Sequence, residues 1–214
     1  MVLGIVMSHP HYEMPQALYA AYKHASSQKF YPLGTVRCSG DVMFRSQLSR
    51  DLGCLLDVDE TVVAWLCLPV EIPTSDRVHV PDVMVDYDDG TRVFLDACDE
   101  EGDASVSEAA ACSRIHHRFV PRAEIETGCR LANAKDMLRY ASYRTPLNDR
   151  MRLLATLEEA GSLSIAECMH LFREVQPMTG VSWMLLNRMI SADLDERMLG
   201  PETMLRRFTA GGAR

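Results

Sequence analysis

The sequence predicts an α/β protein, in which a small mixed sheet flanked by helices is followed by a helical C-terminal domain. Two observations point to this fold class. Between residues 45 and 143, helical patterns and short β-rich runs follow one another in the order α-β-β-β-α-β-α. After Thr145-Pro146 the β-rich runs give way to amphipathic helical stretches, so we expect a domain boundary there. The predicted division is an N-terminal arm (1–43), an α/β domain (44–145) and a helical domain (146–214).

Length and composition limit the classes of protein to which the chain can belong. With 214 residues, 47% of them hydrophobic, the chain suits one or two domains with a buried core and excludes a disordered protein. The net charge of −8 argues against a general polyanion binder. No apolar run approaches the roughly 20 residues of a membrane span, and the seven cysteines show no CxxC spacing. We therefore expect a cytoplasmic protein with reduced thiols and no membrane partner.

The charge is unevenly distributed. Residues 57–108 hold 15 acids and two bases, whereas residues 109–152 hold nine bases and four acids. The basic segment favours contact with nucleic acid, and the acidic segment opposes it.

The α/β domain begins with a helix, since four leucines between residues 48 and 56 fall on one helical face. The Asp89-Gly90 pair predicts a hairpin turn between two later strands. Upstream of the domain, a short helix is expected over 17–25. The elements expected within it are a helix over 45–56, strands over 62–72, 78–86 and 91–96, a helix over 105–113, a strand over 118–120 and a helix over 132–143.

The C-terminal domain contains a sharp helix-start signal, the capping box of Ser164 and Glu167. The expected elements are helices over 147–160, 164–172 and 181–190, a short hairpin over 192–199 and a last helix over 201–208. Three helices and a small wing are typical of a winged helix-turn-helix. Arg188, on the outer face of the third helix, is a candidate DNA contact, and docking to a protein is the equal alternative.

Two aspartates are the candidate catalytic and metal-binding residues. Asp82 follows Pro81 at the start of one predicted strand, and Asp96 lies on the next. Adjacent strands lie about 5 Å apart, so the two carboxylates can share a Mg²⁺ ion. Cys98 lies two residues beyond Asp96, on the same face of the strand. A lysine at that position would orient the attacking water, and this layout resembles the PD-(D/E)xK nucleases.

The flanking segments make the resemblance more specific. Residues 45–51 (RSQLSRD) and 55–62 (LLDVDETV) resemble the S-x-L-E-R-D and LL-x-x-D-x-x-V signature of TnsA-type transposon endonucleases. Pro81-Asp82 and residues 96–98 (DAC) follow in the family's order, and residues 133–140 (NAKDMLRY) are similar to its N-A-x-x-L-x-x-Y element. The resemblance covers residues 36–208 and implies a restriction-endonuclease-like fold with a C-terminal winged helix.

The departures from the family pattern fall on the site itself. Ser49 stands where the family has a metal-binding glutamate, and Cys98 stands where it has the lysine. Because serine is a poor Mg²⁺ ligand and a neutral thiol lacks the lysine's charge, the resemblance implies weak or absent Mg²⁺ binding and a pseudoenzyme. The alternatives are an active metal-dependent endonuclease with a rearranged site, to which Asp51 or Asp99 could contribute, and an interaction module unrelated to DNA.

The resemblance also implies partners: DNA, a transposase-type protein and an ATPase regulator of a mobile-element or phage-type system. Candidate phosphate contacts are Arg114 and Arg118, which flank His116-His117 after the alanine-rich helix; these histidines could instead cap that helix. His9 and His11 could bind a metal ion, although a free N-terminal arm is the simpler interpretation.

Overall fold

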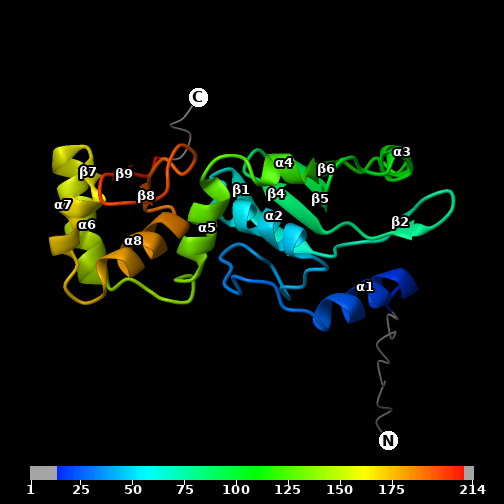
Figure 1. Ribbon diagram of the computed structural model, residues 1–214, viewed down its shortest axis with the longest axis horizontal. Coiled ribbons are helices and arrows are strands. Elements are labelled where there is room, and N and C mark those ends of the chain that lie inside the picture. Colours follow the sequence, from blue (N-terminus) through cyan, green and yellow to red (C-terminus); the bar gives the residue numbers. More distant parts are fainter. Residues whose placement is uncertain (1–13, 210–214) are drawn as a thin grey trace, which may run out of the picture.

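The computed structural model describes residues 14–209 and confirms an α/β protein with a mixed sheet (Figure 1). The helices are α1 (Gln16–Ser26), α2 (Gln47–Val58), α3 (Ala104–Cys112), α4 (Arg122–Ile125), α5 (Arg130–Leu138), α6 (Leu147–Ala160), α7 (Ile165–Cys168), the 3₁₀ helix η1 (Met169–Leu171) and α8 (Pro177–Leu186). The strands are β1 (Val62–Cys67), β2 (Ile72–Pro73), β3 (Val78–His79), β4 (Val83–Tyr87), β5 (Arg92–Cys98), β6 (His117–Pro121), β7 (Leu163–Ser164), β8 (Ile190–Ser191) and β9 (Met204–Arg207). Among the described residues, no helix is long and apolar enough to cross a membrane.

The central sheet has the strand order β1-β4-β5-β6. Its first three strands are antiparallel, and β6 runs parallel to β5. Helix α3 lies on the connection between these two parallel strands, as a crossover requires. The Asp89-Gly90 turn joins β4 to β5, and Gly90 takes the positive φ of 83° that such a turn needs.

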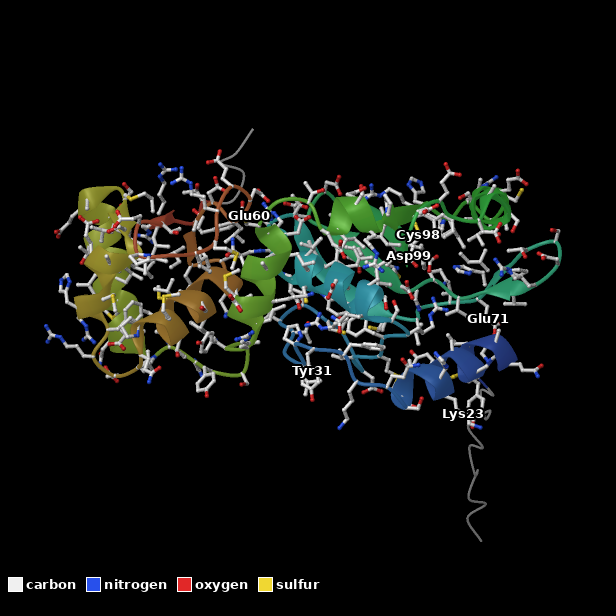
Figure 2. All side chains as sticks on the ribbon, in the orientation of Figure 1. Lys23, Tyr31, Glu60, Glu71, Cys98 and Asp99 are labelled. Carbon is white, nitrogen blue, oxygen red and sulfur yellow. The ribbon has the colours of Figure 1, made fainter. Side chains whose placement is uncertain are left out.

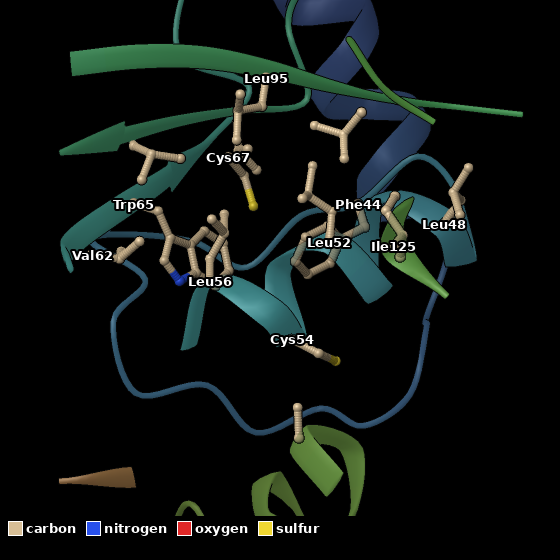
Figure 3. Close-up of a cluster of buried hydrophobic side chains, with 14 of the residues drawn as sticks. Phe44, Leu48, Leu52, Cys54, Leu56, Val62, Trp65, Cys67, Leu95 and Ile125 are labelled. Atoms are coloured by element: carbon tan, nitrogen blue, oxygen red, sulfur yellow. The ribbon is translucent and has the colours of Figure 1, made fainter. Parts of the chain in front are cut away.

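Helix α2 provides the main apolar layer against this sheet. It begins at a capping box, in which the Ser46 hydroxyl accepts a hydrogen bond from the backbone N–H of Ser49. The buried side chains Leu52 and Leu56 pack with Trp65 of β1 in one hydrophobic cluster, which Figure 3 shows between the helix and the strands. Burial of these large apolar side chains is the main force that holds α2 to the sheet.

Two of the strands expected from the sequence are each divided. The run over 62–72 breaks after β1, where Leu68 has a φ of 48°. The run over 78–86 breaks at Pro81-Asp82, because proline has no N–H to give to a ladder. As a result β2 and β3 pair with each other as a separate ribbon.

The described part of the expected N-terminal arm, residues 14–43, packs against the α/β core. Ala25 of α1 is buried in the main hydrophobic cluster. Arg50 of α2 donates hydrogen bonds to the carbonyls of Pro32 and Gly34, at 2.7 and 2.6 Å. These contacts make residues 14–43 part of the first domain's structure.

The C-terminal region is not all-α, and on this point the expectation was wrong. A three-stranded sheet of order β7-β9-β8 accompanies α6, α7 and α8. Strand β7 directly precedes the Ser164–Glu167 capping box, and β9 lies where a last helix was expected. Strand β9 pairs with both β7 and β8, and its Leu205 is fully buried while the other three residues of the strand are exposed. The hairpin expected over 192–199 is not formed.

A packed junction joins the two regions. Helix α5 contacts both α2 and α8, as Figure 1 shows at the centre of the molecule. Arg37 donates a hydrogen bond to the carbonyl of Leu186 at 3.1 Å, and Leu186 and Leu194 belong to the cluster of the α/β core. Asn133 of α5 donates to the carbonyls of Leu194 and Arg197 at 2.9 and 2.8 Å. The boundary near Pro146 is therefore a change of architecture across a shared interface.

Candidate functional site

The structure brings Asp82 and Asp96 together, in the way the sequence predicts. Val83 lies opposite Leu95 on the antiparallel pair β4 and β5, so the next residues in each direction face each other. The backbone N–H of Asp82 donates to Asp96 Oδ1 at 3.0 Å, and that of Ala97 donates to Asp82 Oδ2 at 3.1 Å. Both aspartates are buried, with 7% and 4% of their surface exposed.

Arg45 lies against both carboxylates. Its Nη2 is 2.7 Å from Asp82 Oδ1 and 3.5 Å from Asp96 Oδ1, and its Nε is 3.1 Å from Asp82 Oδ1. Arg45 directly precedes the capping residue Ser46, so the start of α2 fixes its position. Arg45 lies in the family-like motif over residues 45–51, and the sequence alone assigns it no role.

Two histidines hold the other oxygen of Asp96. His79 Nε2 of β3 lies 2.6 Å from Asp96 Oδ2, and His117 Nε2 of β6 lies 2.7 Å from the same atom. The His117 side chain is 1% exposed and that of His79 is 17% exposed. His117 therefore points into the cluster and does not cap the alanine-rich helix. His79 was not predicted, because it lies 17 residues from Asp96 on a different strand and no local pattern around it indicates this contact.

The partners of the two carboxylates set their pKa values in opposite directions. Burial alone would raise the pKa of Asp96, but hydrogen bonds from His117 and His79 outweigh it and lower the pKa to about 2. Burial raises the pKa of Asp82, and the nearby charge of Asp96 acts in the same direction against the opposing effect of Arg45. Asp96 is therefore held as a carboxylate, and Asp82 is the more easily protonated member of the pair.

Ser49 and Cys98, the other predicted site residues, are occupied elsewhere. The Ser49 hydroxyl donates to the Ser46 carbonyl at 3.0 Å and accepts from the Ser46 N–H at 3.2 Å, which completes the capping box. Cys98 Sγ lies 3.5 Å from the carbonyl of Glu100, and Figure 2 marks it with Asp99 at the end of β5. Burial and the charges of Asp96 and Asp99 raise the pKa of Cys98, which keeps the thiol neutral.

The cluster does not suit the Mg²⁺ ion that the family resemblance implies. Mg²⁺ needs near-octahedral oxygen ligands at about 2.0–2.1 Å. Here the Oδ1 atoms of Asp82 and Asp96 face the guanidinium of Arg45, and Oδ2 of Asp96 faces two imidazole nitrogens. Neither of the alternative ligands is paired with the two aspartates: Asp51 pairs with Lys135 at 2.8 Å, and Asp99 pairs with Arg122 at 2.5 Å.

Two of the three predicted DNA contacts are exposed, and the third contacts the α/β domain. Arg114 is exposed in the turn after α3, and Arg118 is exposed on β6 beside Glu124, at 2.7 Å. Arg188 is engaged within the molecule, since its guanidinium donates to the carbonyls of Asp59, at 2.7 Å, and Val62 across the junction. Asp59 directly follows α2, and Val62 is the first residue of β1. Their carbonyls need a hydrogen-bond donor when the junction buries them. His9 and His11 lie outside the described residues.

Comparison of the chain with models of known protein families and with curated proteins gave no match. We therefore infer a function from the geometry and chemistry of one site, the carboxylate cluster, which consists of Arg45, His79, Asp82, Asp96 and His117.

Proposed function

We propose that this chain is a TnsA-like nuclease-fold protein that has lost cleavage and acts as a DNA- or transposase-binding accessory in a mobile-element or phage-type system. One observation carries the proposal: the guanidinium of Arg45 contacts both Asp82 and Asp96, on the side where a shared metal ion would sit. Arg45 supplies a fixed positive charge to the two carboxylates. It offers no coordination position for a water nucleophile, which a catalytic metal ion must keep open.

The missing lysine supports the same conclusion. In the resemblance, Cys98 takes the place of the residue that would stabilise developing charge on the phosphate. A neutral thiol cannot do so, and Arg45 is already paired with the aspartates. Loss of one such electrostatic stabiliser costs on the order of 10²–10³ in rate.

We also propose that the C-terminal region is a winged helix used for docking. Its three helices and the β7-β9-β8 sheet supply the parts of that fold. Helix α8 does not read a DNA groove in this proposal, because Thr179, Ser182 and Met184 are buried and Arg188 binds the first domain. DNA contact is assigned instead to the basic segment 109–152, through Arg114 and Arg118.

A plasmid-nicking assay tests the loss of cleavage. The full chain is incubated with supercoiled plasmid in Mg²⁺ or Mn²⁺, beside Asp82→Ala as the background. We expect equal, negligible nicking by both proteins. Nicking by the wild-type chain that disappears in Asp82→Ala would refute the proposal.

The active endonuclease with a rearranged site is the second candidate, because His79 and His117 bring two extra metal ligands to Asp96. The same assay, repeated with Zn²⁺ and Co²⁺, separates the candidates. Nicking that requires both histidines would favour this enzyme, with His116→Ala as the control. His116 is exposed and directly precedes His117, the first residue of β6.

Fluorescence anisotropy with a labelled duplex tests the DNA contact. We expect the double variant Arg114→Ala/Arg118→Ala to bind about tenfold more weakly and to lower the salt slope by about 2. Arg92→Ala is the matched control, since Arg92 is also exposed and paired with an acid, Asp86, in the acidic segment. Equal affinity of the three proteins would overturn the assignment of the contact to Arg114 and Arg118, and an absence of binding by all three would favour an interaction module unrelated to DNA.

A further inference from the structure

One side of the carboxylate cluster has the composition of a transition-metal site. His79 Nε2, Asp96 Oδ2 and His117 Nε2 all lie within 4.8 Å of one another. The three residues come from β3, β5 and β6, so the site depends on the fold and on no local sequence motif. Arg45 faces the other oxygen of Asp96, which leaves this side to the histidines.

We propose that His79, Asp96 and His117 bind one Zn²⁺ ion, separately from the pair formed by Arg45 and Asp82. Two imidazoles and one carboxylate are a donor set that Zn²⁺ accepts readily, at about 2.0–2.2 Å from each ligand. A tetrahedral ion with three protein ligands keeps a fourth position for water or another ligand. Mg²⁺ disfavours imidazole ligands, so the same site discriminates against it.

The distances require only a small adjustment. Each histidine nitrogen now lies 2.6 or 2.7 Å from Asp96 Oδ2, as a hydrogen-bond partner. Ligands about 2.1 Å from a tetrahedral ion are roughly 3.4 Å apart, so each imidazole nitrogen must move back by about 0.7–0.8 Å. The ion replaces the two hydrogen bonds, and the ligating nitrogens bind it in their unprotonated form.

The carboxylate of Asp96 is already held in an orientation that suits a bound ion. Asp96 Oδ1 accepts the backbone N–H of Asp82 at 3.0 Å, which fixes the carboxylate plane and turns Oδ2 toward the histidines. His117 is fully enclosed, whereas His79 retains 17% exposure. An ion can therefore enter past His79, and the fourth ligand position lies on that side.

Charge favours a divalent ion at this place. Asp82 and Asp96 carry two negative charges when ionised, and Arg45 balances one of them. Arg45 also lies near enough to Asp96 to oppose a cation bound at the same carboxylate. Replacing Arg45 with glutamine should therefore tighten zinc binding. If the residues formed only a hydrogen-bonded network, the substitution would have no such effect.

Titration calorimetry of the chelator-stripped full chain with ZnCl₂ is the test. We expect one equivalent of Zn²⁺ to bind. The Zn²⁺ affinity should fall by more than about 100-fold in His79→Ala or His117→Ala, because loss of a residue that only orients a metal ligand already costs about 10–100-fold. His116→Ala is the matched control and should bind as the wild type does. The double variant His9→Ala/His11→Ala excludes a terminal site and should also bind normally.

A Co²⁺ titration gives a second readout. The proposed site predicts the visible absorption of a four-coordinate Co²⁺ ion without the thiolate charge-transfer bands that a cysteine ligand would add. Unsaturable binding, an equal loss in His116→Ala, or thiolate bands would overturn the proposal. Circular dichroism of each variant shows whether it is folded. Zinc binding and plasmid nicking are measured separately, so failure of one proposal leaves the other testable.

Discussion

Buried aspartates anchor both regions of the molecule, but their partners differ. In the C-terminal region, Asp149 of α6 accepts hydrogen bonds from three successive backbone N–H groups, those of Arg173, Glu174 and Val175, at 3.1, 3.1 and 3.3 Å. Arg152, one turn along the same helix, also contacts it. In the first region, the partners of Asp96 are largely side chains that come from different segments of the chain.

The difference separates a structural carboxylate from a candidate site. Backbone N–H groups cannot leave or exchange a proton for a metal ion, so Asp149 serves to hold the loop before α8 in place. Imidazole nitrogens can exchange a proton for a metal ion, and so the partners of Asp96 can change chemical state. The experiments below test whether this distinction holds.

The largest expected effect is on stability, in Asp149→Ala. The variant removes the acceptor of three backbone N–H groups and of Arg152, at hydrogen bonds that are partly buried, and we expect it to lose about 3–5 kcal/mol of unfolding free energy. Urea unfolding followed by circular dichroism measures the loss. Glu158→Ala is the control on the same helix, because Glu158 forms an exposed ion pair with Arg207. A loss no larger than that of the control would contradict a structural role for Asp149.

The pair formed by Arg45 and Asp82 should show a smaller and strongly coupled effect. Either Asp82→Ala or Arg45→Met alone leaves a partly buried charge with a poorer partner, at a cost of about 2–3 kcal/mol. The double variant removes both charges and should cost less than the sum of the two, with a coupling energy of about 1–3 kcal/mol. Urea unfolding of all four proteins closes the cycle. Additive losses would show that Arg45 does not balance the aspartates.

The pH dependence of stability provides a test on Asp149. Burial would raise the pKa of Asp149, but the N–H groups of Arg173, Glu174 and Val175, aided by Arg152, lower it. A folded-state pKa below the unfolded one means that the stabilisation is complete above the unfolded value, about 3.9, and disappears as the pH falls through the folded value. The difference in unfolding free energy between wild type and Asp149→Asn should therefore shrink from pH 6 toward pH 3. A constant difference would show that Asp149 does not titrate differently in the two states.

The contrast between local contacts and contacts with distant segments explains which features the sequence could predict. Local signals predicted three features correctly. The leucine spacing predicted α2, the Ser164–Glu167 box predicted the start of α7, and the adjacency of two strands joined by the Asp89-Gly90 turn placed Asp96 beside Asp82. Residues whose role depends on distant segments were missed. Arg45 and His79 meet the aspartates across 37 and 17 residues of chain, and no local pattern encodes such contacts. Strand β9 was mistaken for a helix because its four residues are too few to show their period.

The smallest expected effect concerns Ser49 and the two capping boxes. Ser164 and Glu167 form one box in the C-terminal region, and Ser46 and Ser49 form the other at the start of α2. Ser46→Ala and Ser164→Ala each remove an N-cap and should cost about 1 kcal/mol, whereas Ser49→Ala removes only the reciprocal bond and should cost about 0.5 kcal/mol. Thermal unfolding of the three variants measures these differences.

The outcome for Ser49 bears on the carboxylate cluster as well as on the cap. Its buried hydroxyl donates to the Ser46 carbonyl and accepts from both the N–H and the hydroxyl of Ser46, so it has no free lone pair to offer a metal ion. Zinc affinity should therefore be the same in Ser49→Ala and wild type, while His117→Ala abolishes binding. If Ser49→Ala weakened zinc binding as much as a histidine variant does, the Ser49 hydroxyl would have to reach the ion. The conclusion that Ser49 only caps α2 and does not bind the metal ion would then be wrong.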